Sequence, residues 1–320
     1  MIRIALVTTW GVRCGVAEHA ANLVGHMKDP DIKYEIWGGP YEASLLRPKI
    51  LQGHYDIVHF NYESGFLGIF SPGVARTFGN RLVITLHDHW PRNNRVGYPF
   101  TTEFDRVVIH QKSDDIYGNF RHIPQGIVPL TPQTWSPTNT TIGTAGFPLW
   151  QKRVEEVAQA TALLVKETPR VTGIEMVCPE SAHVDTYEMK GKVKRAFPQA
   201  VYHTAWMDQY EVMAILSKNL VNVFPYKDGK PGISASVRLG IGTGSHIVLS
   251  KCTMFEDIYN DEAYHDEVEW IEGEVTPRTI ADACLRVIES GKRPKRILED
   301  MNWTRCSQMY SDLYKEMMVK

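Results

Sequence analysis

This sequence lacks several features that would place it in a specialised class of protein. No apolar run approaches the length of a membrane span, which argues against a membrane-embedded protein. The net charge of −2 provides no basic face of the kind that nucleic-acid binding usually needs. The five cysteines are scattered, odd in number and without metal-ligand spacing. They indicate a reducing compartment and no disulfide framework.

The N-terminus also lacks the marks of a secretion signal. Its first ten residues carry one arginine, no long apolar core and no small-residue cleavage site, so we interpret them as a first strand. We therefore expect a cytoplasmic protein. Peripheral contact with a membrane stays open, because the basic segment 292–296 could touch anionic lipid, although four cations in a turn are more often solvated surface.

What the sequence does contain is a repeated alternation of apolar strands and helical segments. Its 320 residues, 43% hydrophobic and 22% charged, suit two soluble domains of about 150 residues each. The alternation predicts an α/β fold with a parallel sheet in each half. Residues 129–141, with three prolines and five threonines, interrupt it and mark the boundary. Among the helices we expect one at 17–27 and a last one at 300–318.

The most informative stretch is residues 220–250, which predicts a strand, a glycine-bearing basic loop, a helix and a second strand. Ser234 suits the N-cap of that helix. A helix N-terminus at the end of a sheet attracts phosphate, because its N–H groups and its dipole both favour an anion. The same turn occurs in βαβ units that bind nothing, so this stretch alone leaves both interpretations open.

In the first half, polar residues follow the predicted strands, where parallel sheets bind ligands. His87 follows the strand 81–86 and could act as a base or as a hydrogen-bond donor to substrate. Alternatively, His87 could simply cap the strand, with its nitrogens satisfied by Asp88 or by the backbone. Glu63 could bind a sugar hydroxyl or cap a helix. A metal site of His87, Asp88 and His89 is disfavoured, because neighbours in an extended segment point in opposite directions.

Seven motifs in order resemble those of the family 4 glycosyltransferases, and they span nearly the whole chain. Two lie in the first turn and strand (13–18, RCGVAE; 56–63, DIVHFNYE), and two follow (85–88, TLHD; 122–127, HIPQGI). The last three are the glycine-to-lysine loop 146–152 (GFPLWQK), the unit 224–248, and the closing segment 302–314.

The resemblance implies a GT-B fold, with two Rossmann-like domains whose parallel sheets face a cleft. The domains would be residues 1–130 on the acceptor side, 142–298 on the donor side, and a helix at 299–320 that packs back on the first domain. It implies a retaining enzyme that moves a sugar from a nucleotide-diphosphate sugar to a hydroxyl of a glycan, glycolipid or small molecule. No metal and no other cofactor is expected.

The resemblance also assigns roles to individual residues. His87 would bond the donor sugar and Lys152 would neutralise the diphosphate. Glu63 and Asp88 would lie on the acceptor or sugar side. The donor-binding set would be Gly15, Val16, Lys152, Arg153, Gly232, Ile233, Ser234 and Arg238.

Two departures from the family pattern leave other functions open. The family's two donor-site glutamates correspond to Pro231 and Leu239, and an arginine common after the loop glycine corresponds to Phe147. An inactive GT-B protein that binds a nucleotide sugar, or serves as a scaffold, is therefore the alternative. A nucleotide-sugar epimerase is less favoured, because the carboxylates that it would need are not found.

Overall fold

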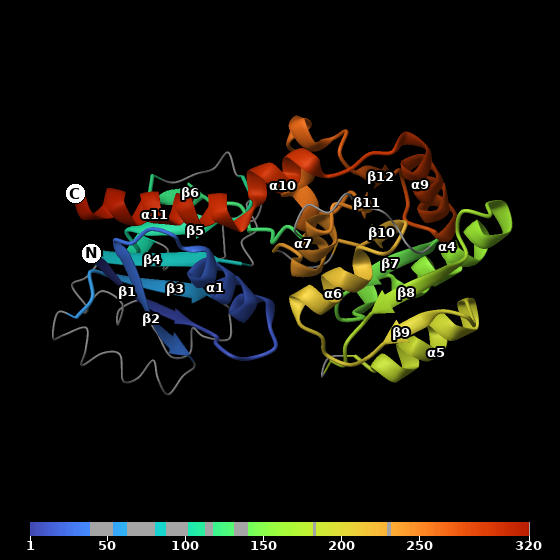
Figure 1. Ribbon diagram of the computed structural model, residues 1–320, viewed down its shortest axis with the longest axis horizontal. Helices are drawn as coiled ribbons and strands as arrows, with labels where there is room; N and C mark the ends of the chain where they lie inside the picture. Colours follow the sequence, from blue (N-terminus) through green and yellow to red (C-terminus); the bar gives the residue numbers. More distant parts are fainter. Residues whose placement is uncertain are drawn as a thin grey trace. The chain divides into compact units, whose positions relative to one another are not determined.

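The computed structural model describes residues 1–38, 54–62, 81–87, 102–112, 118–130, 140–181, 184–228 and 232–319. The chain divides into two compact units (Figure 1). The first unit comprises Met1–Gly126, Pro231–Ile233 and Met301–Lys320, and the second comprises Ile127–Lys230 and Ser234–Asp300. Each unit contains one six-stranded sheet, and all the pairings between its strands are parallel. The predicted pair of parallel α/β domains is confirmed.

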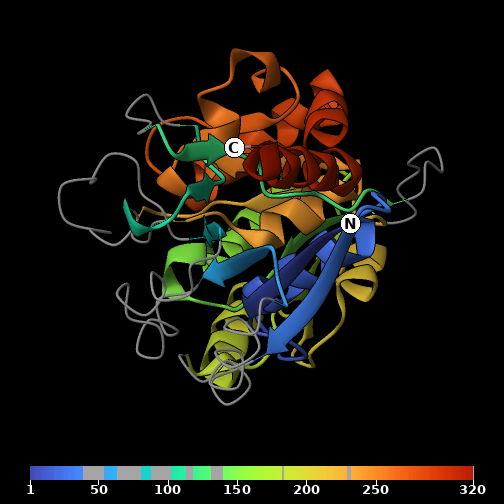
Figure 2. The same cartoon turned by 90° about the vertical axis from the view of Figure 1, so that its left-hand side faces the viewer.

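The sheet of the first unit has the strand order β2-β1-β3-β4-β5-β6. Strands β1 and β2 lie side by side in both views (Figures 1 and 2). The chain reverses its direction of winding between β1 and β3, and such a reversal is where parallel sheets bind ligands. The strands are β1 (Ile2–Thr8), β2 (Ile32–Gly38), β3 (Ile57–Tyr62), β4 (Arg81–Leu86), β5 (Arg106–Ile109) and β6 (Phe120–His122).

Two helices of the first unit, α1 (Gly15–His26) and α11 (Trp303–Val319), pack against each other. Helix α1 begins two residues before the predicted start, because the thiol of Cys14 accepts a bond from the Ala17 amide and caps it. Helix α11 approaches the backbone closely at Gly126, where a Cβ atom would lie 2.3 Å from the Trp303 ring. A residue other than glycine would push that ring away.

The sheet of the second unit has the order β12-β11-β10-β7-β8-β9, the Rossmann order, with its reversal between β7 and β10. The strands are β7 (Thr141–Ala145), β8 (Gly173–Val177), β9 (Val201–His203), β10 (Val221–Phe224), β11 (His246–Ser250) and β12 (Glu269–Ile271). The helices of at least seven residues in this unit are α4 (Val154–Glu167), α5 (Thr186–Ala196), α6 (Gln209–Leu216), α7 (Ala235–Gly242), α9 (Pro277–Ser290) and α10 (Lys295–Met301).

The end of the chain differs from the single helix predicted at 300–318. Two helices occur, because α10 ends at Met301 and the Asn302 side chain accepts a bond from the Arg305 amide, 2.9 Å away. An asparagine in that position starts a new helix. In the described part of the chain, no helix combines the length and the apolar character that crossing a bilayer requires.

Candidate functional site

In the second unit, the loop after β7 is shaped by Gly146. Its φ of +110° is a conformation that side-chain-bearing residues rarely adopt. A Cβ atom here would lie 2.2 Å from Ser236 Oγ and 2.3 Å from Lys152 Nζ. The glycine therefore lets the lysine amine and the first turn of α7 come close to the backbone.

Lys152 ends the short 3-10 helix η4 (Trp150–Lys152). Its Nζ donates to Ser236 Oγ at 3.2 Å and lies 5.2 Å from the centroid of the Tyr226 ring. The ring face and the hydroxyl both favour a cation in this position. A positive charge is thus held beside the carboxyl ends of β7 and β10, at the reversal point of the sheet.

Ser234 is the N-cap residue of α7, as predicted, but its side chain does not cap the helix. Its hydroxyl instead donates to Tyr226 Oη at 3.4 Å. Within the described part of the chain, the first N–H groups of α7 therefore lack a side-chain cap, which leaves them suited to an anion. Gly232, with φ of +107°, and the part-buried Ile233 precede the cap. Leu239 is half-buried on α7, and Pro231 lies outside the described residues.

The structure does not bring the two predicted arginines to the partners of Lys152. Arg153 has a left-handed backbone (φ 52°), and its Nη1 donates to Glu156 Oε1 and to the Val275 carbonyl, each at 3.1 Å. Arg238 is 4% exposed and its Nη2 forms an ion pair with Asp257. Both guanidinium groups therefore already have acceptors within the second unit.

In the first unit, Asn61 connects the elements at the reversal point. Its Nδ2 donates to Thr8 Oγ1 at 3.1 Å and to the Val16 carbonyl at 3.0 Å. Because a carbonyl only accepts, this contact fixes the orientation of the amide. Its Oδ1 therefore faces His87 Nε2, at 2.6 Å. The predicted residues Val16 and His87 are thus joined through Asn61.

His87 belongs to a cluster of imidazoles. Its Nδ1 lies 3.3 Å from His110 Nε2, and His110 Nδ1 lies 2.8 Å from the Ile123 carbonyl. The ring of His19, on the buried face of α1, lies 4.6 Å from that of His87 between centroids. Both His87 nitrogens thus face partners inside the unit, so a bond from Nε2 to a sugar would replace the contact with Asn61.

Burial controls the charge of this cluster. It lowers the pKa of His87 well below the ordinary value of 6.5, and His110 and His59 lower it further. Burial also lowers the pKa of His19, with smaller contributions of the same sign from the neighbouring imidazoles. The Asn61 side chain raises that pKa, although no described residue makes a contact with hydrogen-bond geometry to either ring nitrogen of His19. Both imidazoles are therefore neutral at pH 7.

The structure gives fewer contacts for the remaining predicted site residues. Gly15 is the first residue of α1 and Val16 the second, so both lie at a helix N-terminus beside β1. Glu63 and Asp88 lie outside the described residues.

Sequence reasoning missed Asn61, His110, Ser236 and Tyr226. A signal for His110 existed, because it follows β5 just as His87 follows β4, and Leu86 pairs with Ile109 in parallel register. Two residues that follow paired strands at the same level lie side by side. For Ser236 the signal was weaker, since a serine in a first helical turn is common without a ligand.

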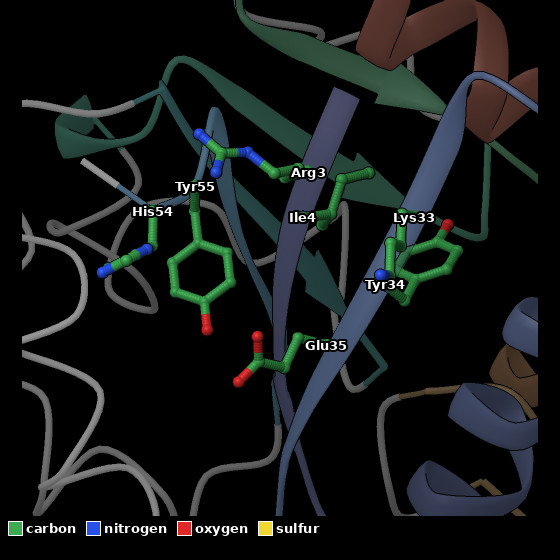
Figure 3. Close-up of a pocket in the computed structure, with 7 residues that line it drawn as sticks. All are labelled: Arg3, Ile4, Lys33, Tyr34, Glu35, His54 and Tyr55. Carbon is green, nitrogen blue, oxygen red and sulfur yellow. The ribbon is translucent and has the colours of Figure 1, made fainter. Parts of the chain in front are cut away.

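A pocket of about 240 Å³ lies elsewhere in the first unit, near the amino ends of β1 and β2 (Figure 3). Figure 3 shows the Glu35 and Tyr55 side chains pointing toward each other, with the Tyr34 ring turned away from them. The pocket is remote from the carboxyl ends of these strands, so it is distinct from the polar residues described above. It is lined by Arg3, Ile4, Lys33, Tyr34, Glu35, His54 and Tyr55.

No protein-family model and no curated protein sequence matches this chain. Solved structures do resemble it. Alr3699/HepE of Anabaena in complex with UDP and glucose has 13% identity and a TM-score of 0.73, over 99% of this chain and 100% of that one. A glycosyltransferase from Rickettsia africae has 12% identity and a TM-score of 0.69, over 99% and 98%.

A third similar structure is an E. coli trehalose-6-phosphate protein bound with UDP-2-fluoro glucose. It has 13% identity and a TM-score of 0.67, over 98% of this chain and 99% of that one. At such identities, likeness establishes the fold alone. This likeness confirms the predicted fold, whereas membership of family 4 stays a prediction. This chain has the GT-B fold.

Proposed function

We propose that this protein transfers a sugar from a nucleotide-diphosphate sugar to a hydroxyl group of an acceptor. The observation that carries the proposal is the place of Lys152. Its amine lies 3.2 Å from Ser236 Oγ, on the first turn of α7, beside the reversal point of a Rossmann-ordered sheet. Complexes of similarly folded proteins with UDP, glucose and a UDP-sugar analogue support a nucleotide sugar as donor.

The chemistry needs a positive site where negative charge develops. During transfer the bond between the anomeric carbon and the donor phosphate oxygen breaks, and a bond to the acceptor oxygen forms. Charge then builds on the departing nucleoside diphosphate. Lys152 and the uncapped N–H groups of α7 would receive it, and Gly146 leaves room for the phosphates to approach the backbone. We propose that these groups replace a metal ion at the diphosphate.

Finer features of the proposal rest on the family resemblance. The resemblance implies that the anomeric configuration is retained and that His87 donates a hydrogen bond to the donor sugar. It also implies donor contacts by a larger set of residues: Gly15, Val16, Gly232, Ile233, Arg153 and Arg238. The sugar contact needs a proton on His87 Nε2, and the 2.6 Å approach of that atom to Asn61 Oδ1 is consistent with one.

The experiment that tests the proposal is a binding panel followed by an acceptor screen. Nucleoside diphosphates and nucleotide sugars are titrated with EDTA present, by calorimetry and thermal shift. UDP and UDP-glucose come first. We expect selective binding of one base, weakened in Lys152→Ala and unchanged in Lys166→Ala. The control removes the same charge from an exposed position on α4.

The alternative is a GT-B protein that binds a nucleotide sugar without turnover. It is motivated by Pro231 and Leu239, which stand where the family carries glutamates. Donor binding without transfer or hydrolysis across a broad acceptor set would favour this function. Absence of binding by every nucleotide, with the protein folded, would contradict both.

A further inference from the structure

Three imidazoles converge inside the first unit from three separate elements. His19 comes from α1, His87 follows β4 and His110 follows β5. One nitrogen of each ring lies within 4.8 Å of the nitrogens of the other two. The ring centroids are 4.6 Å (His19–His87), 5.1 Å (His19–His110) and 5.0 Å (His87–His110) apart. The rings therefore form a nearly regular triangle.

The hydrogen bonds fix which nitrogen of two rings bears the proton. His110 Nδ1 must donate to the Ile123 carbonyl, 2.8 Å away. His87 Nε2 must donate to Asn61 Oδ1, because the amide nitrogen of Asn61 already donates to the Val16 carbonyl. A neutral imidazole has a proton on one nitrogen only. When both rings are neutral, the two remaining nitrogens, His87 Nδ1 and His110 Nε2, face each other with lone pairs across 3.3 Å.

Two facing lone pairs repel unless a cation lies between them. Donation of the other ring N–H to a carbonyl or amide oxygen is also the usual support of a metal-bound histidine, since it fixes the ring and its tautomer. Both rings have this support, from the Ile123 carbonyl and from Asn61 Oδ1. The pair is thus arranged as two metal ligands are.

His19 supplies an independent observation. Its side chain is buried, at 2% exposure, and neither ring nitrogen has a hydrogen-bond partner among the residues that the structure describes. An unpartnered imidazole in the interior is costly, because it loses its bonds to water without replacement. Trp303 lies edge-on against it, with 4.9 Å between centroids. A metal ion would supply the partner that the ring lacks.

The 3.3 Å between His87 Nδ1 and His110 Nε2 and the spacing of the three ring centroids agree with a tetrahedral ion. Zinc–nitrogen bonds of about 2.0–2.1 Å place the ligand nitrogens about 3.3 Å apart and, with the ring radius added, the ring centres about 5 Å apart. We propose that His19, His87 and His110 bind one divalent transition-metal ion of the zinc class. Three imidazole nitrogens select zinc, cobalt or copper over magnesium and calcium, which prefer oxygen.

Such an ion would join α1 to the carboxyl ends of β4 and β5. It would also hold His87 as the tautomer with its proton on Nε2, the form that can donate to Asn61 or to a sugar. The site does not depend on the proposed transferase activity, because metal binding is measured without a donor. A failure to bind metal and a failure to transfer sugar are therefore separate results.

The experiment uses the full chain, stripped with a chelator and titrated with Co²⁺ and then Zn²⁺. We expect one equivalent of Co²⁺ to give the visible absorption of a tetrahedral nitrogen site, and Zn²⁺ to displace it. At a hundredfold excess of Zn²⁺ over its Kd, Tm should rise by about 5 °C or more. X-ray absorption of the zinc-loaded, unmodified protein should show three imidazole ligands. This measurement needs no variant.

His19→Gln and His110→Gln should each lower Co²⁺ affinity at least about 100-fold, since even supporting residues of metal sites contribute about 10–100-fold. His59→Gln is the matched control, because it removes another buried imidazole of this unit, one whose nitrogens are bonded to Tyr314 and Thr85. Circular dichroism establishes that each variant is folded. A tetrahedral Co²⁺ spectrum that persists in both His19→Gln and His110→Gln would overturn the proposal. So would the unmodified protein failing to bind either metal at pH 7–8, with imidazole NMR showing a proton shared by His87 and His110.

Discussion

The imidazole of His59, on β3, and the hydroxyl of Tyr314, on α11, lie 2.7 Å apart, although 255 residues separate them in the chain. Both side chains are fully buried. Tyr34 Oη donates to Tyr314 Oη at 3.3 Å, and His59 Nε2 lies 2.8 Å from Thr85 Oγ1. A chain of hydrogen bonds thus attaches the last helix to the sheet of the first unit.

Tyr314→Phe should lower the free energy of unfolding by about 1–3 kcal/mol, because it leaves a buried imidazole nitrogen without its partner. Urea unfolding followed by fluorescence measures the change. Tyr187→Phe, which removes an exposed hydroxyl bonded to Glu180, should shift the value by less than about 0.5 kcal/mol. Equal effects in the two variants would contradict a special role for Tyr314.

Stability should fall as the pH drops below 6.5, in part through His59. Burial lowers the pKa of His59 to about 3, from an ordinary 6.5. Between these values the unfolded chain binds a proton that the folded protein does not. This contribution is therefore fully present above pH 6.5, decreases by up to about 1.4 kcal/mol per pH unit below it, and is lost by about pH 3.

His59→Gln isolates that contribution. The variant is less stable at pH 7, but the difference from the unmodified protein should shrink by about 1.4 kcal/mol per unit as the pH falls from 6 to 4.5. Denaturant unfolding at four pH values, with chelator present, measures it. The other histidines and the carboxylates are common to both proteins and cancel. A difference that stays constant with pH would contradict the lowered pKa.

Lys152→Ala should lower transfer at least about 100-fold, the scale for loss of a group that stabilises developing charge. Ser236→Ala, which removes only the hydroxyl 3.2 Å from the amine, should lower it about fivefold. Initial rates with saturating acceptor measure both, and Lys166→Ala serves as the control. Unchanged turnover in Lys152→Ala would remove this residue from the site.

Gly146→Ala should weaken nucleotide binding and destabilise the second unit. The new methyl group would lie 2.2 Å from Ser236 Oγ and 2.3 Å from Lys152 Nζ, at a φ of +110°. Lys152 would have to move away from the first turn of α7. Gly25→Ala is the matched control: it lies within α1, no described atom comes within 4 Å of the added methyl group, and the change should be neutral or stabilising by about 0.5–1 kcal/mol. Calorimetry with the nucleotide that binds best compares the two.

Arg238→Met should cost about 3–5 kcal/mol, because it leaves the buried Asp257 carboxylate without its ion pair. Arg238→Met combined with Asp257→Leu should recover most of that loss, since an apolar pair needs no compensating charge. Thermal unfolding of the single and double variants measures the recovery. Loss of nucleotide binding in a stable double variant would instead support the donor-binding role that the family resemblance assigns to Arg238.

Several elements could be predicted because local chemistry determines them. The strand at residues 81–86 occurs with the bounds that its apolar run indicated. The place of Ser234 as the N-cap residue of α7 was predicted for the same reason. The strand at 269–271 was not, because three residues carry too little periodicity. The break between α10 and α11 at Asn302 was missed, because the sequence does not show whether an asparagine within an apolar helical pattern continues one helix or caps the next.

The sequence by itself determined which residues stand at the ends of strands and in the glycine loop. His87 and Ser234 were found in this way, because strand period and loop composition are local properties, whereas Gly146 and Lys152 were assigned through the family resemblance. Only the tertiary structure decided their partners. Parallel register sets His110 beside His87, and folding of the last helix onto the sheet gives His59 its bond to Tyr314. A local pattern determines on which side of a helix or strand a residue lies. The residues that it contacts depend on how distant elements pair, and that pairing depends on the packing of the whole unit.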